Sequence, residues 1–94
     1  MPGTGNKNYQ QLERVVRGFS NHRRIQIMDL LQRFPEKSVI EIANELHINF
    51  KTASEHIRRL AITGLLVKRS DGVSIRQRLT SRGTLILKFL RTLE

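Results

Sequence analysis

Residues 49–59 concentrate side chains that can hydrogen-bond to the edges of nucleic-acid bases. On a helix, at about 100° per residue, Lys51, Glu55 and Arg58 project from one side. Lysine and arginine can donate to guanine O6 and N7, and glutamate can accept from cytosine N4. Ser54 lies on one flank of this side, and Thr52 and Arg59 lie on the other. The candidate contact residues of this segment are Asn49, Lys51, Thr52, Ser54, Glu55, Arg58 and Arg59.

The same side chains also suit an ordinary solvated helix face. Glu55 precedes Arg58 and Arg59 by three and four residues, spacings at which opposite charges pair along a helix. Base contact and ion pairing are therefore both open for Glu55. The Ser54 hydroxyl can equally bond back to a helix carbonyl. We expect Phe50 to pack under the preceding helix rather than to contact a thymine methyl group.

A second group of cations flanks the dipeptide Asp71-Gly72. This dipeptide is a strong signal for a two-residue hairpin turn, in which both central residues have positive φ. Short segments on either side, 65–69 and 73–79, have the composition of strands. The hairpin would carry the candidate contact residues Lys68, Arg69, Arg76 and Arg78. Charges on an exposed strand edge also prevent aggregation, so both roles remain open.

The composition argues against metal and redox chemistry. The chain has no cysteine, and its three histidines, His22, His47 and His56, are scattered without a second ligand at metal-binding spacing. Ser54 and His56 are two residues apart on a helix, so they diverge and do not form a nucleophile and base. We expect no cofactor, no bound metal and no enzymatic activity.

The elements that position these residues follow from the spacing of apolar side chains and from capping residues. Helices are predicted over 9–19, 22–34, 39–46 and 49–63, and Thr80 can cap a final helix. Ser38 and Glu41 form a capping box for the third helix. The predicted order is α-α-α-α-β-β-α, with one minimal strand near Lys37 pairing with the hairpin. This is a mainly α chain with a small β-hairpin, the pattern of a winged helix-turn-helix.

The charge points to a polyanionic partner. The 94 residues include 17 Lys and Arg against 8 Asp and Glu, a net charge of +9. Residues 48–94 hold ten basic and three acidic residues, so +7 of the excess lies in the second half. We expect a tail at 1–8, one domain at 9–94, no membrane association and a cytoplasmic location on the nucleoid.

The segments NHRRIQIMDLL and ELHINFKTASEHIRRLAITGLL, with the SDG hairpin, resemble ArsR-type winged-helix regulators. LTSRG resembles the opening of the last helix in MarR-type and PadR-type regulators. The resemblance covers about Phe19 to Gly83 and implies that Ser54 touches DNA and that dimers pair through the terminal helices. The chain lacks the cysteine pair of the family's arsenic and cadmium sensors, and His47 replaces the usual glycine of the turn. Histidine is enriched at positive φ, so the turn remains feasible with some strain.

The first and last helices carry more apolar residues than one small core uses. We expect these faces to pair in a symmetric homodimer, the alternative being that they pack on each other within one subunit. The expected dimer residues are Tyr9, Leu12, Val16, Leu85, Ile86, Phe89, Leu90 and Leu93.

These features favour a transcriptional regulator that binds specific double-stranded DNA and represses by occupying an operator. A second hypothesis is a winged-helix module for protein interaction or assembly, which a large apolar patch without a basic face would favour. RNA binding is a third, weakened because only Phe50 among the five aromatic residues lies near the basic segment.

Overall fold

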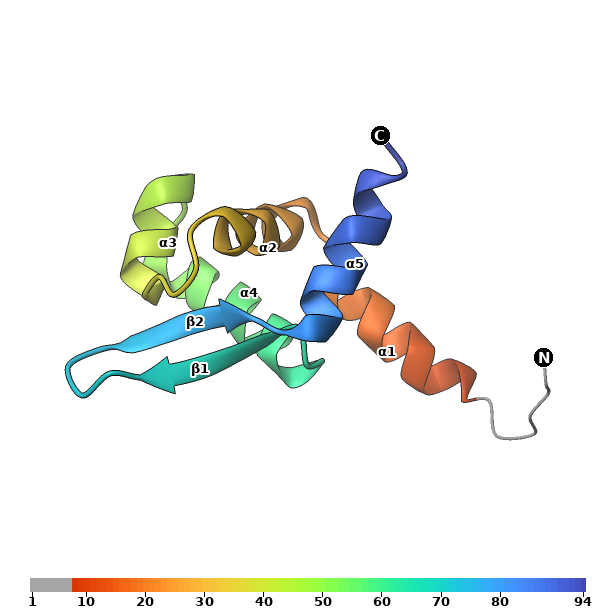
Figure 1. The fold of residues 1–94 in the computed structure, drawn as a ribbon, viewed down its shortest axis with the longest axis horizontal. Helices are drawn as coiled ribbons and strands as arrows, with labels where there is room; N and C mark the ends of the chain where they lie inside the picture. The colour runs from red at the N-terminus through yellow and green to blue at the C-terminus, as the bar shows by residue number, and fades with distance from the viewer. Residues whose placement is uncertain (1–7) are drawn as a thin grey trace.

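The computed structural model describes residues 8–94, and its elements follow the predicted order (Figure 1). The winged helix-turn-helix architecture is therefore confirmed, with helix bounds within one residue of those predicted. The elements are α1 (Tyr9–Phe19), α2 (His22–Arg33), α3 (Val39–Leu46), α4 (Phe50–Ile62), β1 (Leu66–Ser70), β2 (Ile75–Leu79) and α5 (Ser81–Arg91).

Each helix begins at a polar side chain that accepts hydrogen bonds from backbone amides of the first turn. Those amides have no partner within the helix, so such a cap contributes about 1 kcal/mol. At α3 the cap is reciprocal, because the Ser38 hydroxyl accepts from the Glu41 amide and the Glu41 carboxylate accepts from the Ser38 amide. The capping residues are Asn8, Asn21, Ser38, Asn49 and Thr80.

One core joins α2, α3, α4 and α5 to the start of the hairpin. Complete burial of a large aliphatic side chain contributes about 1.5–3 kcal/mol, so these positions fix how α4 is presented. The largest fully buried side chains are Ile27, Met28, Leu31, Ile42, Ile57, Leu60, Leu65 and Gln77.

The turn between α3 and α4 adopts the left-handed conformation at His47, with φ 55° and ψ 46°. The His47 and Ile48 amides donate to the Asn44 and Ala43 carbonyls, at 3.3 and 3.0 Å, and so close the end of α3. The expectation that histidine can replace glycine in this turn is confirmed.

The hairpin loop differs from the predicted two-residue turn. Ser70 pairs with Ile75, so residues 71–74 form a four-residue loop in which Gly72 alone has positive φ, at 91°. The Asp71 carboxylate accepts from the Val73 and Ser74 amides at 3.1 and 2.8 Å, which favours the longer loop. Val73 therefore lies in the loop and not in the strand.

The predicted minimal strand near Lys37 is confirmed as a single bridge. The Gln77 amide donates to the Lys37 carbonyl at 2.8 Å, which ties β2 to the segment before α3.

Two glycines allow close packing of α1 and α5 against the rest of the fold. A Cβ on Gly18 would lie 2.4 Å from Thr63 Oγ1 on the end of α4, and one on Gly83 would lie 2.5 Å from the Leu65 carbonyl. These contacts set the positions of α1 and α5.

The predicted tail lies outside the described residues except for Asn8, which caps α1. Within residues 8–94, no helix is both long enough and apolar enough to cross a bilayer. Figure 1 shows the hairpin projecting at one end of the molecule and α1 extending at the opposite end.

Candidate nucleic-acid interface

Helix α4 has one buried and one solvent-facing side, as its sequence predicted. Ala53, Ile57 and Leu60 are at most 2% exposed, which anchors the helix against the core. Lys51 and Arg58 lie on the opposite, exposed side. Since α4 directly follows the turn after α3, this side is what a helix-turn-helix presents to a major groove.

Glu55 forms ion pairs with both arginines that follow it on α4. Arg58 donates through Nε and Nη2 at 3.0 and 2.8 Å, and Arg59 donates through Nε at 3.0 Å. These hydrogen bonds lower the pKa of Glu55 to about 2 and raise the pKa of Arg58. Of the two possibilities, the ion-paired helix face is the one observed. A cytosine amino group would have to compete for carboxylate oxygens that are already occupied.

The first half of α4 carries polar side chains with fewer intramolecular contacts. Within residues 8–94, the side chains of Lys51, Thr52 and Ser54 make no ion pair and no hydrogen bond, so the alternative back-bond of Ser54 is absent. Asn49 is partly occupied, because its Oδ1 accepts from the Lys51 and Thr52 amides at 2.7 and 3.3 Å. Phe50 is 53% exposed, so the expectation that it packs under α3 is wrong in large part.

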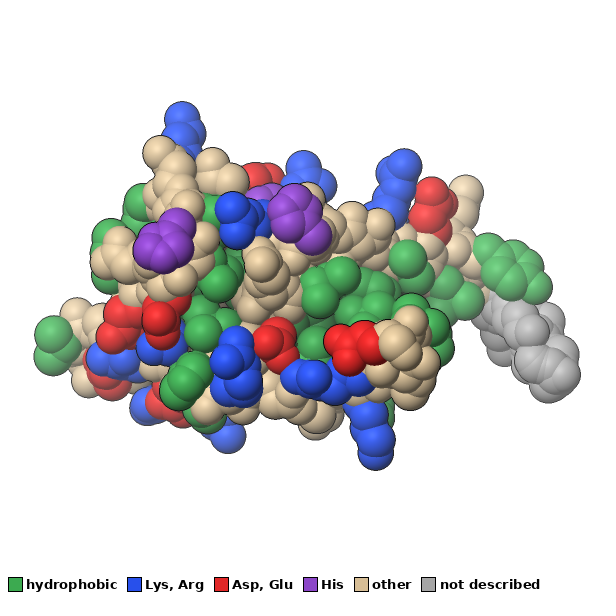
Figure 2. Space-filling model, turned by 90° about the horizontal axis from the view of Figure 1, so that it is seen from above, with side chains coloured by type: hydrophobic (Ala, Val, Ile, Leu, Met, Phe, Trp, Pro, Cys, Tyr) green, Lys and Arg blue, Asp and Glu red, His purple; other side chains and the backbone are tan. Residues whose placement is uncertain are grey.

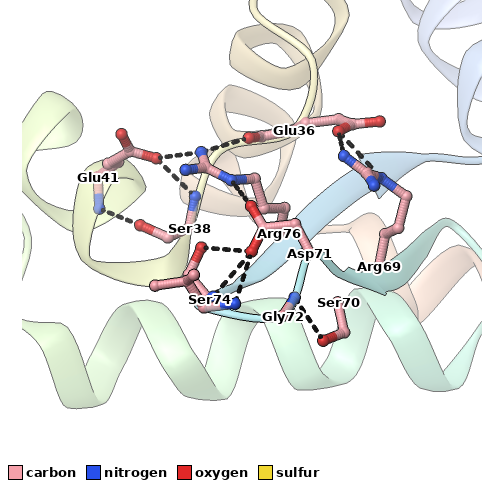
Figure 3. A network of polar contacts seen from close by, with 10 residues as sticks. Glu36, Ser38, Glu41, Arg69, Ser70, Asp71, Gly72, Ser74 and Arg76 are labelled. Atoms are coloured by element: carbon pink, nitrogen blue, oxygen red, sulfur yellow. Dashed lines mark hydrogen bonds and ion pairs between the residues drawn. The ribbon is translucent and has the colours of Figure 1, made fainter.

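Two wing arginines are held by acidic groups at the junction of the wing with α3 (Figure 3). Arg76 donates to Asp71 at 3.0 Å, to the Glu41 carboxylate at 3.2 Å and to the Glu36 carbonyl at 3.0 Å. Arg69 donates through Nε to the Glu36 carboxylate at 3.0 Å. Glu36 itself has a positive φ of 68°. Arg69 and Arg76 therefore fix the wing to the helix-turn-helix.

The charges of this wing junction stabilise one another. The Arg69 hydrogen bond lowers the pKa of Glu36, and that carboxylate raises the pKa of Arg69. The pKa of Asp71 is lowered first by its hydrogen bond from the Ser74 amide, and then by those from Arg76 and the Val73 amide. All these carboxylates stay ionised at neutral pH, so the wing remains tied.

Lys68 and Arg78 are the wing cations without such a restraint. Their side chains make no ion pair within residues 8–94. Lys68 pairs with Gln77 and Arg78 pairs with Val67, so their side chains lie on opposite faces of the hairpin. These two wing cations are the ones that no carboxylate of residues 8–94 pairs with.

Sequence reasoning missed the acidic partners of the wing and the cations next to the second half of α4. Glu36 and Arg69 are separated by 33 residues, so no local spacing could have paired them. Arg14 and Arg17, on α1, stand three residues apart on a helix, which is a visible signal. Together with Arg24 they lie beside Arg58 and Arg59.

The terminal helices leave apolar side chains in contact with solvent. Figure 2 shows hydrophobic side chains gathered over α5 and towards α1. The alternative hypothesis, that the two apolar faces pack on each other within one subunit, is thus wrong for most of the expected dimer residues. Ile86 and Leu90 are exceptions, because they pack partly against the core. The exposed residues are Tyr9, Leu12, Val16, Leu85, Phe89 and Leu93.

No three His, Asp or Glu side chains in the described part of the chain lie together as metal ligands would. His56 instead accepts a hydrogen bond through Nδ1 from Arg24 Nε at 3.2 Å. Burial, followed by the Arg24 charge, lowers the pKa of His56. This histidine is therefore a neutral acceptor at neutral pH.

Comparison with known proteins agrees with this geometry. The family described as "Bacterial regulatory protein, arsR family" matches residues 21–68, just over half of the 94 residues. No curated protein matches the chain.

Several solved structures share the fold. The homodimeric winged helix-turn-helix DNA-binding domain of Mb0332 from Mycobacterium bovis, a possible ArsR-family transcriptional regulator, has 28% identity and a TM-score of 0.83, covering 99% of this chain and 89% of that one. HlyU from Vibrio cholerae has 25% identity and a TM-score of 0.78, covering 94% and 96%. An ArsR-like transcriptional regulator from Rhodococcus sp. RHA1 has 28% identity and a TM-score of 0.72, covering 90% and 77%. By the family match and the shared winged helix-turn-helix, the chain belongs to the ArsR family of bacterial regulatory proteins.

Proposed function

We propose that the chain binds a specific double-stranded DNA sequence as a homodimer and represses transcription by occupying an operator. The observation that carries the proposal is the outer side of α4, where the exposed Lys51 and Thr52 and the half-buried Ser54 make no side-chain hydrogen bond or ion pair within residues 8–94, while the opposite side is packed into the core. A reading helix needs this combination, since base contacts specify sequence only when the helix is rigidly held.

The wing supplies the second set of contacts in this proposal. Lys68 and Arg78, on opposite faces of the hairpin, bind backbone phosphates on the two sides of the wing. Arg69 and Arg76 act indirectly by holding the wing against the start of α3 through Glu36 and Glu41. Phosphate neutralisation provides most of the affinity, as the net charge of +9 favours, and the groups on α4 provide specificity.

Arg58 and Arg59 remain contact candidates despite their bond to Glu55. An arginine has five donors, and Glu55 occupies two of those of Arg58 and one of those of Arg59. The ion pairs also hold both side chains in fixed positions. Asn49 contributes its amide nitrogen, because its oxygen is used in the cap.

Selection of bound sequences from random duplex DNA at about physiological salt tests this proposal. The expected result is a two-fold symmetric motif with half-sites about 10 base pairs apart, one turn of DNA. Retention of all sequences alike would contradict specific readout. Loss of all duplex DNA would instead favour the protein-interaction module.

The homodimer in this proposal buries the apolar surface of α1 and α5. The related Mb0332 domain is described as homodimeric, which supports a second copy of this chain as the occupant. Phe89, 58% exposed on α5, would lie in that interface, whereas Val73, 96% exposed, lies at the wing tip. In sedimentation equilibrium at micromolar concentration, we expect Phe89→Lys to give a folded monomer and Val73→Lys to remain dimeric. A wild-type mass near 10.9 kDa would refute the dimer.

A further inference from the structure

A surface pocket of about 310 Å³ lies between α1, α2 and the second half of α4. Five arginines from these three helices line it: Arg14, Arg17, Arg24, Arg58 and Arg59. Pockets that hold small molecules begin at about this size, and the space is larger than one small inorganic ion needs.

Close packing of α1 on α4 brings these arginines together. Gly18 lies directly against Thr63 at the end of α4, where any larger side chain would collide. This approach places Arg17, next to Gly18, and Arg14, one turn earlier on α1, beside Arg58 and Arg59. The arrangement is therefore a consequence of the fold and not of chance side-chain positions.

Arg24, which lines this arginine pocket, is held in place by three hydrogen bonds. Its Nη1 donates to the carbonyls of Arg17 and Gly18 at 3.0 and 3.1 Å, and its Nε donates to His56 at 3.2 Å. These three bonds use neutral acceptors, so the Arg24 charge is not compensated by them. Fixed guanidinium donors of this kind lose little entropy when an anion binds.

The positive charge of the arginine pocket is only partly balanced. Its five guanidinium groups face two carboxylates, Glu55 and the Glu13 carboxylate that lies 3.6 Å from Arg17, which leaves an excess of three positive charges. Arg14 has no ion pair within the described residues. Burial, followed by repulsion from Arg59, lowers the pKa of Arg24. An anion in this space would relieve that repulsion.

We propose that the arginine pocket is a binding site for a phosphate group. Guanidinium forks from three helices suit the several acceptor oxygens of a phosphate group. Its negative charge, one in a phosphodiester and about two in a phosphomonoester, offsets part of the local excess of three positive charges. The phosphate has two sources, the DNA backbone near the reading helix or a free phosphorylated small molecule. The first source rests on the function proposed above, and the second does not.

Titration of inorganic pyrophosphate into the DNA-free protein at low ionic strength tests the site without reference to DNA. The Arg Nε signals in a ¹H–¹⁵N spectrum report binding. We expect saturable binding that Arg14→Gln weakens about tenfold, and that Arg17→Gln, a second exposed position, also weakens. The matched control is Arg33→Gln, which removes one charge outside the pocket and leaves Asp29 paired with Arg91.

The two sources give different results with duplex DNA. If the DNA backbone supplies the phosphate, Arg14→Gln weakens binding to selected and random duplexes equally and reduces the salt slope by about one. If a free ligand supplies the phosphate, Arg14→Gln weakens pyrophosphate binding but leaves the salt slope of DNA binding unchanged. The proposal is overturned if neither Arg14→Gln nor Arg17→Gln changes pyrophosphate binding or the salt slope, including the case in which pyrophosphate does not bind. Because the pyrophosphate measurement needs no DNA, failure of the site and failure of DNA binding remain distinguishable.

Discussion

Adding one methyl group at Gly18 is expected to disturb the packing of α1 on α4. The new Cβ would lie 2.4 Å from Thr63 Oγ1, 2.6 Å from its Cγ2 and 2.9 Å from its Cβ. Thr63 is 9% exposed, and its hydroxyl lies 3.2 Å from both the Arg59 and the Leu60 carbonyls. Turning the Thr63 side chain away would break these hydrogen bonds, so the overlap is relieved either at that cost or by moving α1 away from α4.

The expected cost follows from overpacking in well-packed sites, about 1–3 kcal/mol. The higher helix propensity of alanine relative to glycine offsets part of this cost, by at most about 1 kcal/mol. A net loss of about 1–2 kcal/mol would lower the melting temperature by roughly 4–16 °C for a domain of this size. Urea unfolding followed by circular dichroism measures the free energy directly.

The contact between Gly18 and Thr63 is isolated by a double-mutant cycle. In the Thr63→Ala background, Oγ1 and Cγ2 are gone, so Gly18→Ala should cost at least about 0.5 kcal/mol less than in the wild type. Unchanged stability of Gly18→Ala, or costs that simply add in the double variant, would refute the reasoning about how α1 docks on α4.

Three further predictions concern the turn, the histidine and metal. His47→Gly should raise the free energy of unfolding by about 0.5–1 kcal/mol, because glycine accepts the φ of 55° without strain; a loss of stability in urea unfolding would contradict this. Burial lowers the pKa of His56 in the folded protein, and the charges of Arg24, Arg23 and His22 lower it further, while Glu55 raises it. The unfolded chain therefore binds a proton at a higher pH than the folded protein does. Stability should for this reason fall as the pH drops through about 6.5. His56→Gln, which keeps an acceptor for Arg24, should flatten this dependence, and a wild-type stability that is level from pH 7.5 to 5.5 would rule it out. Zinc added to chelator-treated protein should leave DNA affinity unchanged, and a stoichiometric tenfold change would reveal a ligand set between subunits.

Local signals account for most of what could be predicted from the sequence. The capping box of Ser38 and Glu41, the caps Asn49 and Thr80 and the turn at His47 each depend on residues within a few positions of one another. Hydrophobic spacing then gave the buried side of α4, because the 3.6-residue period alone separates the core side from the solvent side.

Spacing along the chain does not decide which of two competing partners a side chain takes. Asp71-Gly72 favoured a two-residue turn, but the Asp71 carboxylate captured two loop amides and Arg76, which stabilises a longer loop. Arg69 is equally basic in either role, and its commitment to Glu36 depends on a contact across 33 residues. The role of Glu55 was undecidable from spacing, since an ion pair and a base contact need the same exposed position.

The arginine pocket shows the same limit. Arg14 and Arg17 are one turn apart on α1, but their meeting with Arg58 depends on Gly18 fitting against Thr63. Tertiary packing of this kind leaves no local pattern in the chain.

The central claim is that the exposed side of α4 reads bases while the wing binds the backbone. It is tested most directly by the affinities of wild type, Lys51→Ala and Arg78→Ala for a selected duplex and a random duplex over a salt series, with Lys88→Ala as the charge control on α5. Lys51→Ala should lose about 1–3 kcal/mol on the selected duplex and much less on the random one. Arg78→Ala should weaken both equally and lower the salt slope by about one. An equal loss on both duplexes for Lys51→Ala would contradict the claim.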